Sequence, residues 1–247
     1  MTTYGYFDDA RREYVITDPQ PPTKWINYVG TLDFGGIVDH TGGMLICKGD
    51  PALNRITKYI PQLPDTDFKG STLYLRVWDG DVQTVLSPLF VPMQTACDRY
   101  ECRVGMGYSR IISEAHGLRT EVTIFVPTGA DCVVQDIRVT NLGEAPRRVE
   151  ALPVVEYTHF DALKQFNNAD WVPQTMQSRA SVHDGKTVLR QYAFMHRETR
   201  INYLTANRPV SSFESRRREF LGANEYGTWA NPLALQQPEL ENGEANR

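Results

Sequence analysis

The 247-residue sequence has no apolar run long enough to cross a bilayer, and its polar N-terminus has no hydrophobic segment of the signal-peptide type. It also has little excess charge: the net charge is −4, and Lys and Arg form no large cluster. Nucleic acids and anionic membranes bind surfaces with clustered Lys and Arg. The densest basic run, at 216–218, is flanked by acids and is interpreted as a solvated edge. We therefore expect a cytoplasmic protein with no nucleic-acid and no membrane partner.

Cysteine is scarce as well, and its pattern does not indicate a metal site. Two of the four cysteines are five positions apart, which is not the spacing of a zinc knuckle, and no second Cys/His pair has ligand spacing. We expect free thiols, as is usual in a reducing compartment. The four residues are Cys47, Cys97, Cys102 and Cys132. The G-x-S-x-G pattern of a nucleophile elbow is also absent.

Short alternating segments dominate the sequence. Apolar residues alternate with polar or aromatic ones at 71–81, and the segments at 99–127 and 131–160 are each interpreted as a hairpin, turning at 114–118 and 141–146. Turn residues recur about every 8 to 15 positions, which is typical of a β-sandwich. The best helical candidate is a single turn near 161–166. The sequence predicts an all-β protein, a large antiparallel β-sandwich.

Two kinds of polar motif are candidates for chemical sites. Backbone N–H groups of HTGG, at 40–43, could bind an oxyanion, but a Gly-Gly turn between strands is the favoured interpretation. Three pairs of acids also stand in turn-like settings, where Asp is common, so turn formation is favoured over acid catalysis. The pairs are Asp8 with Asp9, Asp65 with Asp67, and Asp79 with Asp81.

Several segments, in order, resemble the N-terminal part of the cellobiose phosphorylase family. They are YGYFDDARREYVITDPQPPTKWINYVG, HTGG, NRITKY, GYSRI, FVP and VTN. The family comprises inverting glycoside phosphorylases that act on cellobiose, cellobionic acid, chitobiose or cellodextrins. The resemblance implies that residues 1–247 are a single N-terminal β-sandwich domain that ends before its last strands. In the family, a helical linker and an (α/α)6 barrel follow this domain.

The resemblance places the chemistry outside this chain. Inverting glycosidases use two carboxyl groups, whereas an inverting phosphorylase needs only the acid, because ionised phosphate is the nucleophile. Family members carry the acid and the phosphate site in the barrel. The resemblance therefore implies no catalytic residue here, no cofactor, and inorganic phosphate as co-substrate. The substrate remains open among the sugars of the family.

The segment FDALKQFNNADWVPQTM, at 160–176, interrupts the strands without the Gly-rich character of a hairpin turn. In the family, which forms homodimers, the corresponding loop reaches the partner subunit's site, near the sugar that leaves. Amides can hydrogen-bond to hydroxyls, and an indole can stack on a pyranose ring. The candidate sugar-binding residues are Gln165, Asn167, Asn168 and Trp171, with Lys164 a weaker candidate. The alternative is a loop that only packs.

The sequence thus predicts the carbohydrate-binding and dimer-forming part of an enzyme that cleaves a β-linked disaccharide with phosphate to give a sugar 1-phosphate. Two alternatives stay open. One is a stand-alone carbohydrate-binding module with an aromatic stacking surface, although no row of aromatic residues is evident in the sequence. The other is a purely structural or dimerisation domain.

Overall fold

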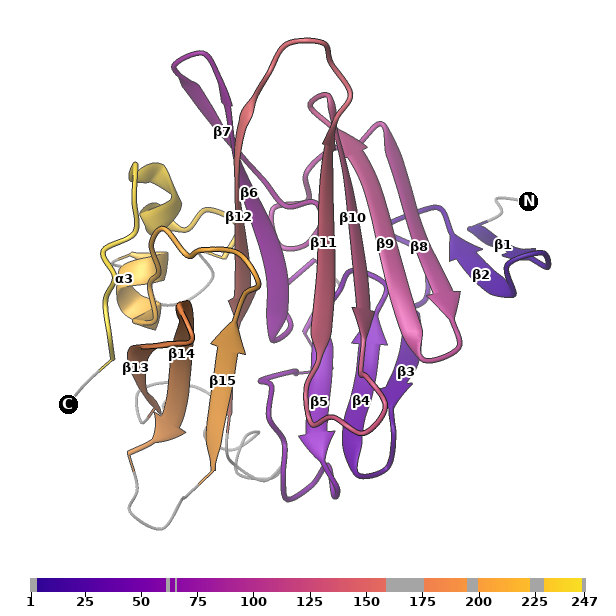
Figure 1. Cartoon of the computed structure of the whole chain (residues 1–247). Coiled ribbons are helices and arrows are strands. Elements are labelled where there is room, and N and C mark those ends of the chain that lie inside the picture. Colours follow the sequence, from indigo (N-terminus) through magenta and orange to yellow (C-terminus); the bar gives the residue numbers. More distant parts are fainter. Residues whose placement is uncertain are drawn as a thin grey trace. The chain divides into compact units, whose positions relative to one another are not determined.

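A computed structural model describes residues 4–60, 63–64, 66–158, 176–194, 200–222 and 229–245. In these ranges the chain consists mostly of antiparallel strands, and helix is confined to two short segments (Figure 1). None of the helices in the described ranges has the length and apolar character needed to span a membrane. The predicted all-β, antiparallel fold class is confirmed.

The chain divides into two compact units. The first contains residues 1–51 and 57–156, and the second contains residues 52–56 and 157–247. The prediction that 1–247 forms a single domain stays a prediction.

A six-stranded antiparallel sheet is the largest element of the first unit. Its strands, in spatial order, are β1 (Gly5–Asp8), β2 (Glu13–Ile16), β8 (Arg99–Gly105), β9 (Tyr108–Ala115), β10 (Leu118–Phe125) and β11 (Val134–Asn141). Burial in β10 alternates at every position, so one face of the sheet packs in the core and the other carries polar side chains.

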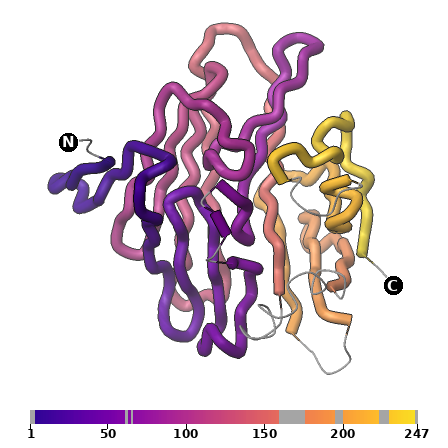
Figure 2. The backbone as a smooth tube through the Cα atoms, turned by 180° about the vertical axis from the view of Figure 1, so that it is seen from behind, coloured from indigo at the N-terminus to yellow at the C-terminus, as the bar shows by residue number. Residues whose placement is uncertain are grey.

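Two smaller sheets complete the first unit. One comprises β3 (Ile26–Gly30), β4 (Phe34–Asp39) and β5 (Met44–Lys48), and it lies behind the six-stranded sheet in Figure 1 and in front of it in Figure 2. The other has β6 (Ser71–Asp79) between β12 (Arg148–Val155) and β7 (Val82–Leu86). Seven successive residues of β6 are buried, as expected for a central strand enclosed on both faces.

The structure corrects the expected pairing at 131–160. β11 and β12 do not form a hairpin: β11 pairs with β10, and β12 pairs with β6 in another sheet. The intervening turn is held by Asn141, whose Nδ2 donates to Ala145 O at 2.6 Å and whose Oδ1 accepts from Gly143 N at 3.1 Å. The turn was predicted correctly, but it connects two sheets. The segment at 99–127 likewise contains three strands, because a second turn separates β8 from β9.

The second unit contains the antiparallel sheet β13 (Met176–His183), β14 (Lys186–Ala193) and β15 (Ile201–Thr205). A short helix, α3 (Arg217–Leu221), and the 3₁₀ turn η1 (Leu233–Gln236) follow. Ser178 and Ser215 hydrogen-bond through their hydroxyl groups at 2.6 Å, which ties β13 to the later segment. The helical turn expected near 161–166 lies outside the described residues.

Candidate functional site

The predicted sugar-binding residues all lie outside the described residues. They are Lys164, Gln165, Asn167, Asn168 and Trp171. The structure does describe the residues on both sides of this segment. Thr158 is buried, and its N–H donates to Ile56 O at 2.7 Å, while Met176 is buried at the start of β13. Both residues belong to the second unit, and both are packed.

The HTGG segment forms a turn around a carboxylate of the chain itself. Asp39 Oδ1 accepts from Thr41 N at 3.0 Å, from the Thr41 hydroxyl at 3.0 Å and from Gly43 N at 2.9 Å. Its Oδ2 accepts from the Tyr59 hydroxyl at 3.3 Å. Gly42 has a φ of +81°, which favours glycine. The N–H groups that could bind an external oxyanion are therefore occupied, and the interpretation of HTGG as a turn is supported.

The four cysteines are free, as predicted. Burial raises the pKa of Cys102, and burial together with the neighbouring Asp98 raises the pKa of Cys97. A raised pKa keeps a thiol protonated at neutral pH, which disfavours both nucleophilic attack and metal binding. Among the residues that the structure describes, no group of three or more His, Cys, Asp or Glu side chains could hold a metal ion.

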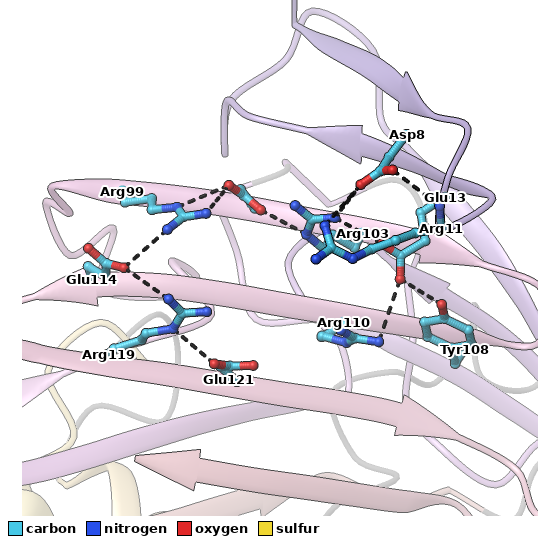
Figure 3. A network of polar contacts seen from close by, with 11 residues as sticks. Asp8, Arg11, Glu13, Arg99, Arg103, Tyr108, Arg110, Glu114, Arg119 and Glu121 are labelled. Atoms are coloured by element: carbon cyan, nitrogen blue, oxygen red, sulfur yellow. Dashed lines mark hydrogen bonds and ion pairs between the residues drawn. The ribbon is translucent and has the colours of Figure 1, made fainter. Parts of the chain in front are cut away.

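A network of paired charges covers the polar face of the six-stranded sheet (Figure 3). At its centre, Arg103 donates to three carboxylates: to Glu101 from Nε at 2.8 Å, and from Nη1 to Glu13 at 3.0 Å and to Asp8 at 3.1 Å. Three strands meet at this guanidinium, because Asp8 lies on β1, Glu13 on β2, and Glu101 on β8 with Arg103. The arginine therefore fastens the N-terminal hairpin to the sheet.

Glu13 is the most deeply buried acid of the network, with an exposed fraction of 3%. The Tyr108 hydroxyl donates to its Oε1 at 2.6 Å, and Arg110 lies 3.5 Å from the same oxygen. Burial alone would raise the pKa of Glu13, but the contacts with Tyr108, Arg103 and Arg110 outweigh it and lower the pKa. The carboxylate is therefore ionised at neutral pH.

The network continues across the sheet through alternating charges. Arg99 contacts Glu101 and Glu114, and Arg119 contacts Glu114 and Glu121. In total the network joins five carboxylates to five guanidinium groups, with Tyr108 as its one uncharged member. The carboxylates are Asp8, Glu13, Glu101, Glu114 and Glu121, and the arginines are Arg11, Arg99, Arg103, Arg110 and Arg119.

This arrangement is suited to holding strands together and not to proton transfer. A general acid needs a pKa near the working pH. The pKa values of Asp8, Glu13 and Glu101 are instead lowered, because contacts with the arginines, and for Glu13 first of all with Tyr108, outweigh the opposing effect of burial. Asp8, Glu13 and Glu101 therefore have no proton to give to a glycosidic oxygen at neutral pH.

Sequence reasoning assigned Asp8 only to a turn and missed the network. Asp8 does accept from Arg11 N at 3.2 Å, as a turn residue does, but it also meets Arg103 from a distant strand. A signal was present: on β8, Arg99, Glu101 and Arg103 alternate in charge at a spacing of two, which places all three on one face.

Comparisons with known proteins agree with this all-β architecture. Residues 12–247 match the family model described as "Glycosyl hydrolase 94, supersandwich domain". The fold and this match define a supersandwich domain. The chain therefore belongs to the glycosyl hydrolase 94 family, which confirms the resemblance to the glycoside phosphorylases.

Its relatives include two N,N'-diacetylchitobiose phosphorylases. The enzyme of Vibrio furnissii is 32% identical over 243 residues, and that of Vibrio proteolyticus is 31% identical over 241 residues; each alignment covers 97% of this chain. A 3-O-beta-D-glucopyranosyl-beta-D-glucuronide phosphorylase of Paenibacillus borealis is 24% identical over 253 residues, or 98% of this chain. The chain spans 29% of the length of each of these relatives.

Proposed function

We propose that this chain is the N-terminal, carbohydrate-binding and dimer-forming part of an inverting phosphorylase that cleaves a β-linked disaccharide with inorganic phosphate to give a sugar 1-phosphate. The observation that carries the proposal is the family match over 12–247, together with relatives that are phosphorylases by name. N,N'-diacetylchitobiose is the first substrate to test, because two relatives above 30% identity are named for it. The glucosyl-glucuronide relative makes a β-glucosyl disaccharide the second.

The proposed division of labour leaves the chemistry outside this chain. Phosphate attacks the anomeric carbon, and one carboxylic acid protonates the leaving oxygen, so no second carboxylate is needed as a base. Asp8, Glu13 and Glu101 do not suit the role of proton donor, because their pKa values are lowered. The 247 residues alone are therefore expected to be inactive. The intact enzyme is proposed to be a cytoplasmic homodimer of the glycosyltransferase type that needs no cofactor.

The contribution of this chain to sugar binding is assigned to the segment at 160–176. Gln165, Asn167 and Asn168 offer amide donors and acceptors to hydroxyls, and Trp171 offers a ring face. In the dimer this segment borders the partner subunit's acceptor-sugar pocket, with Lys164 as a weaker contact. The support is positional and chemical: the segment follows β12 and the packed residue Thr158, and its composition suits a saccharide.

A stand-alone carbohydrate-binding surface is the second candidate, and one observation favours it. Phe7, Tyr14 and Trp25 form a row in the first unit, with ring centroids 4.9 Å apart between Phe7 and Tyr14 and 4.7 Å apart between Tyr14 and Trp25. Phe7 is 76% exposed. Exposed aromatic rings are suited to stacking on sugars, and the row was not evident from the sequence.

Two variants separate these candidates in the full-length protein. In the synthetic direction, Trp171→Ala should raise the KM for the acceptor sugar about threefold to tenfold, because a stacking contact contributes roughly 0.5–1.5 kcal/mol beyond its area. Phe7→Ala is the matched control and should leave that KM unchanged. Release of sugar 1-phosphate from chitobiose and from β-glucosyl disaccharides is the assay.

The opposite results are equally informative. Loss of glycan binding with Phe7→Ala, and unchanged acceptor kinetics with Trp171→Ala, would favour the surface candidate. A full-length protein that releases no sugar 1-phosphate from any β-linked disaccharide would contradict the proposed reaction. Release by the purified 247-residue chain would contradict the assignment of the chemistry to other parts of the enzyme.

A further inference from the structure

The second unit has a sheet face with positive charge and no acid. The strands β13, β14 and β15 lie side by side in Figure 1, and alternate residues of each share a face. One face carries Gln177, Arg179, Ser181, His183, Lys186, Val188, Arg190, Tyr192, Ile201, Tyr203 and Thr205. None of these residues is acidic. Because the whole chain has a net charge of −4, a face with three cations and no acid stands out.

Two of the cations lie directly opposite each other. The register pairs Arg179 on β13 with Arg190 on β14, and Arg190 in turn with Tyr203 on β15. Directly opposite residues have their Cβ atoms about 5 Å apart, and like charges at this distance repel. An anion placed between the two guanidinium groups would convert this repulsion into attraction.

Neither arginine is neutralised by a residue that the structure describes. The Nε of Arg190 is shielded from solvent and has no hydrogen-bond partner. Arg179 donates from Nε to the Tyr192 hydroxyl at 3.2 Å. This hydrogen bond is the main cause of the raised pKa of Arg179. The charge of Glu244 also raises this pKa, but its contribution is the smallest. The carboxylate of Glu244 accepts from Ala180 N at 2.6 Å and forms no ion pair with Arg179.

The opposite face of the sheet is covered at the end that contains Ser178 and Ala193, whereas Val182 at its other end is 74% exposed. At the level of Ser178, the face of Arg179 is the one available to a ligand. Ser178, on the other face of β13, is buried and hydrogen-bonds to Ser215. In contrast, Arg179 and Tyr203 are exposed. The Tyr192 hydroxyl accepts from Arg179 and still has its own proton to donate.

We propose that Arg179 and Arg190, with the Tyr192 hydroxyl, form a binding site for a phosphate group, supplied as inorganic phosphate or as a phosphate monoester. Guanidinium groups bind phosphate oxygens in bidentate geometry, and a tetrahedral dianion has enough acceptors for two guanidinium groups and a hydroxyl. A single carboxylate has only two oxygens for the same donors. The inference uses the charges and register of this sheet and does not rest on the proposed reaction.

The test is a titration of the 247-residue chain with inorganic phosphate, at constant ionic strength maintained with chloride and followed by NMR chemical shifts. Saturable shifts confined to β13, β14 and β15 are expected. Arg179→Gln and Arg190→Gln should each raise the apparent Kd at least tenfold. Arg190→Lys should recover part of the affinity, because it restores the charge but not the planar fork. A parallel titration with glucose 1-phosphate distinguishes the free ion from a monoester.

Arg138→Gln is the matched control, since Arg138 is an exposed arginine on β11 that already pairs with Asp136 at 3.0 Å. It should leave the Kd unchanged. If all three glutamine variants raised the Kd for phosphate equally, the proposal would be overturned. Phosphate would then respond to the overall charge of the chain and not to a specific site. The proposal would also be overturned if neither inorganic phosphate nor glucose 1-phosphate gave saturable shifts in the wild-type chain. If Arg190→Gln does not fold, the exposed Arg179 gives the same test.

Discussion

Two sheet faces of this molecule carry arginine, and they use it differently. On the six-stranded sheet, five arginines meet five carboxylates. On β13–β15, Arg179 and Arg190 meet each other, and neither has an acidic partner among the described residues. The first arrangement keeps strands together. The second leaves positive charge without compensation, which is an arrangement for recognition.

The number of arginines on a face therefore says little about their role unless the partners of each arginine are known. Breaking a buried ion pair leaves an uncompensated charge, so an arginine with acidic partners should be important for stability. An arginine opposite another arginine should add nothing to stability, or subtract from it. Substitution of an arginine of each kind should therefore change the free energy of unfolding in opposite directions.

The largest effect is expected from Arg103→Met. The substitution removes one guanidinium from three carboxylates and leaves Glu13 and Glu101 buried with fewer donors. We expect the free energy of unfolding, measured by urea denaturation, to fall by roughly 3 kcal/mol. Arg138→Ala, which breaks an exposed pair, should lower it by less than about 1 kcal/mol. Equal losses in the two variants would remove the distinction between buried and exposed pairs.

A second carboxylate that accepts several hydrogen bonds, that of Asp39, holds the HTGG turn. Asp39→Ala would leave the N–H groups of Thr41 and Gly43 and the hydroxyl of Tyr59 without their acceptor. Unsatisfied buried donors destabilise, so we expect a loss of about 2 kcal/mol in the free energy of unfolding. Asp39→Asn keeps one acceptor oxygen and should lose less. If the two variants lose the same amount, the negative charge, and not the acceptor, holds the turn.

The dependence of the free energy of unfolding on pH should also distinguish arginines that have carboxylate partners from those that have none. The pKa values of Asp8, Glu13 and Glu101 are lowered in the folded chain, whereas those of unfolded Asp and Glu are about 4. As the pH falls below about 5, the unfolded chain therefore binds protons before the folded chain does, and the free energy of unfolding falls. The stability contributed by these acids is fully present above pH 5.

Arg103→Met should flatten this dependence, because the remaining carboxylates no longer gain from the arginine. Arg190→Gln should leave the slope between pH 5 and pH 3 unchanged, since no acid lies on its face. Urea denaturation at several pH values gives both slopes. An identical slope in wild type and in Arg103→Met would mean that other carboxylates control acid unfolding.

Local patterns in the sequence predicted the elements well and their partners less well. The alternation at Leu118–Phe125 and the turn at 141–146 were both visible in the residues. The pairing of β12 with β6 was not, because the two strands are separated by about 70 positions and nothing local specifies which strand pairs with which. The prediction of a hairpin at 131–160 was wrong for this reason.

The candidate sites divide in the same way. The HTGG turn was predicted correctly, because glycine adopts the positive φ angles of turns without steric cost, so that Gly-Gly between strands indicates a turn. The charge network was missed, since it depends on a register that brings Glu13 of β2 beside Arg103 of β8. Trp171 and its neighbours were chosen through the resemblance and the chemistry of amides and indole, and that prediction stays a prediction.

The smallest effect is the most diagnostic, because its sign should be reversed. In buffer without phosphate, Arg190→Gln removes one of two like charges that lie directly opposite each other. We expect the free energy of unfolding to stay constant or to rise by a few tenths of a kcal/mol, within the roughly 0.2–1 kcal/mol typical of cross-strand pairs. Urea denaturation of the wild type, Arg190→Gln and Arg103→Met under identical conditions gives the three free energies of unfolding to compare. A loss for Arg190→Gln similar to that for Arg103→Met would show that this arginine is structural, and the contrast between the two faces would not hold.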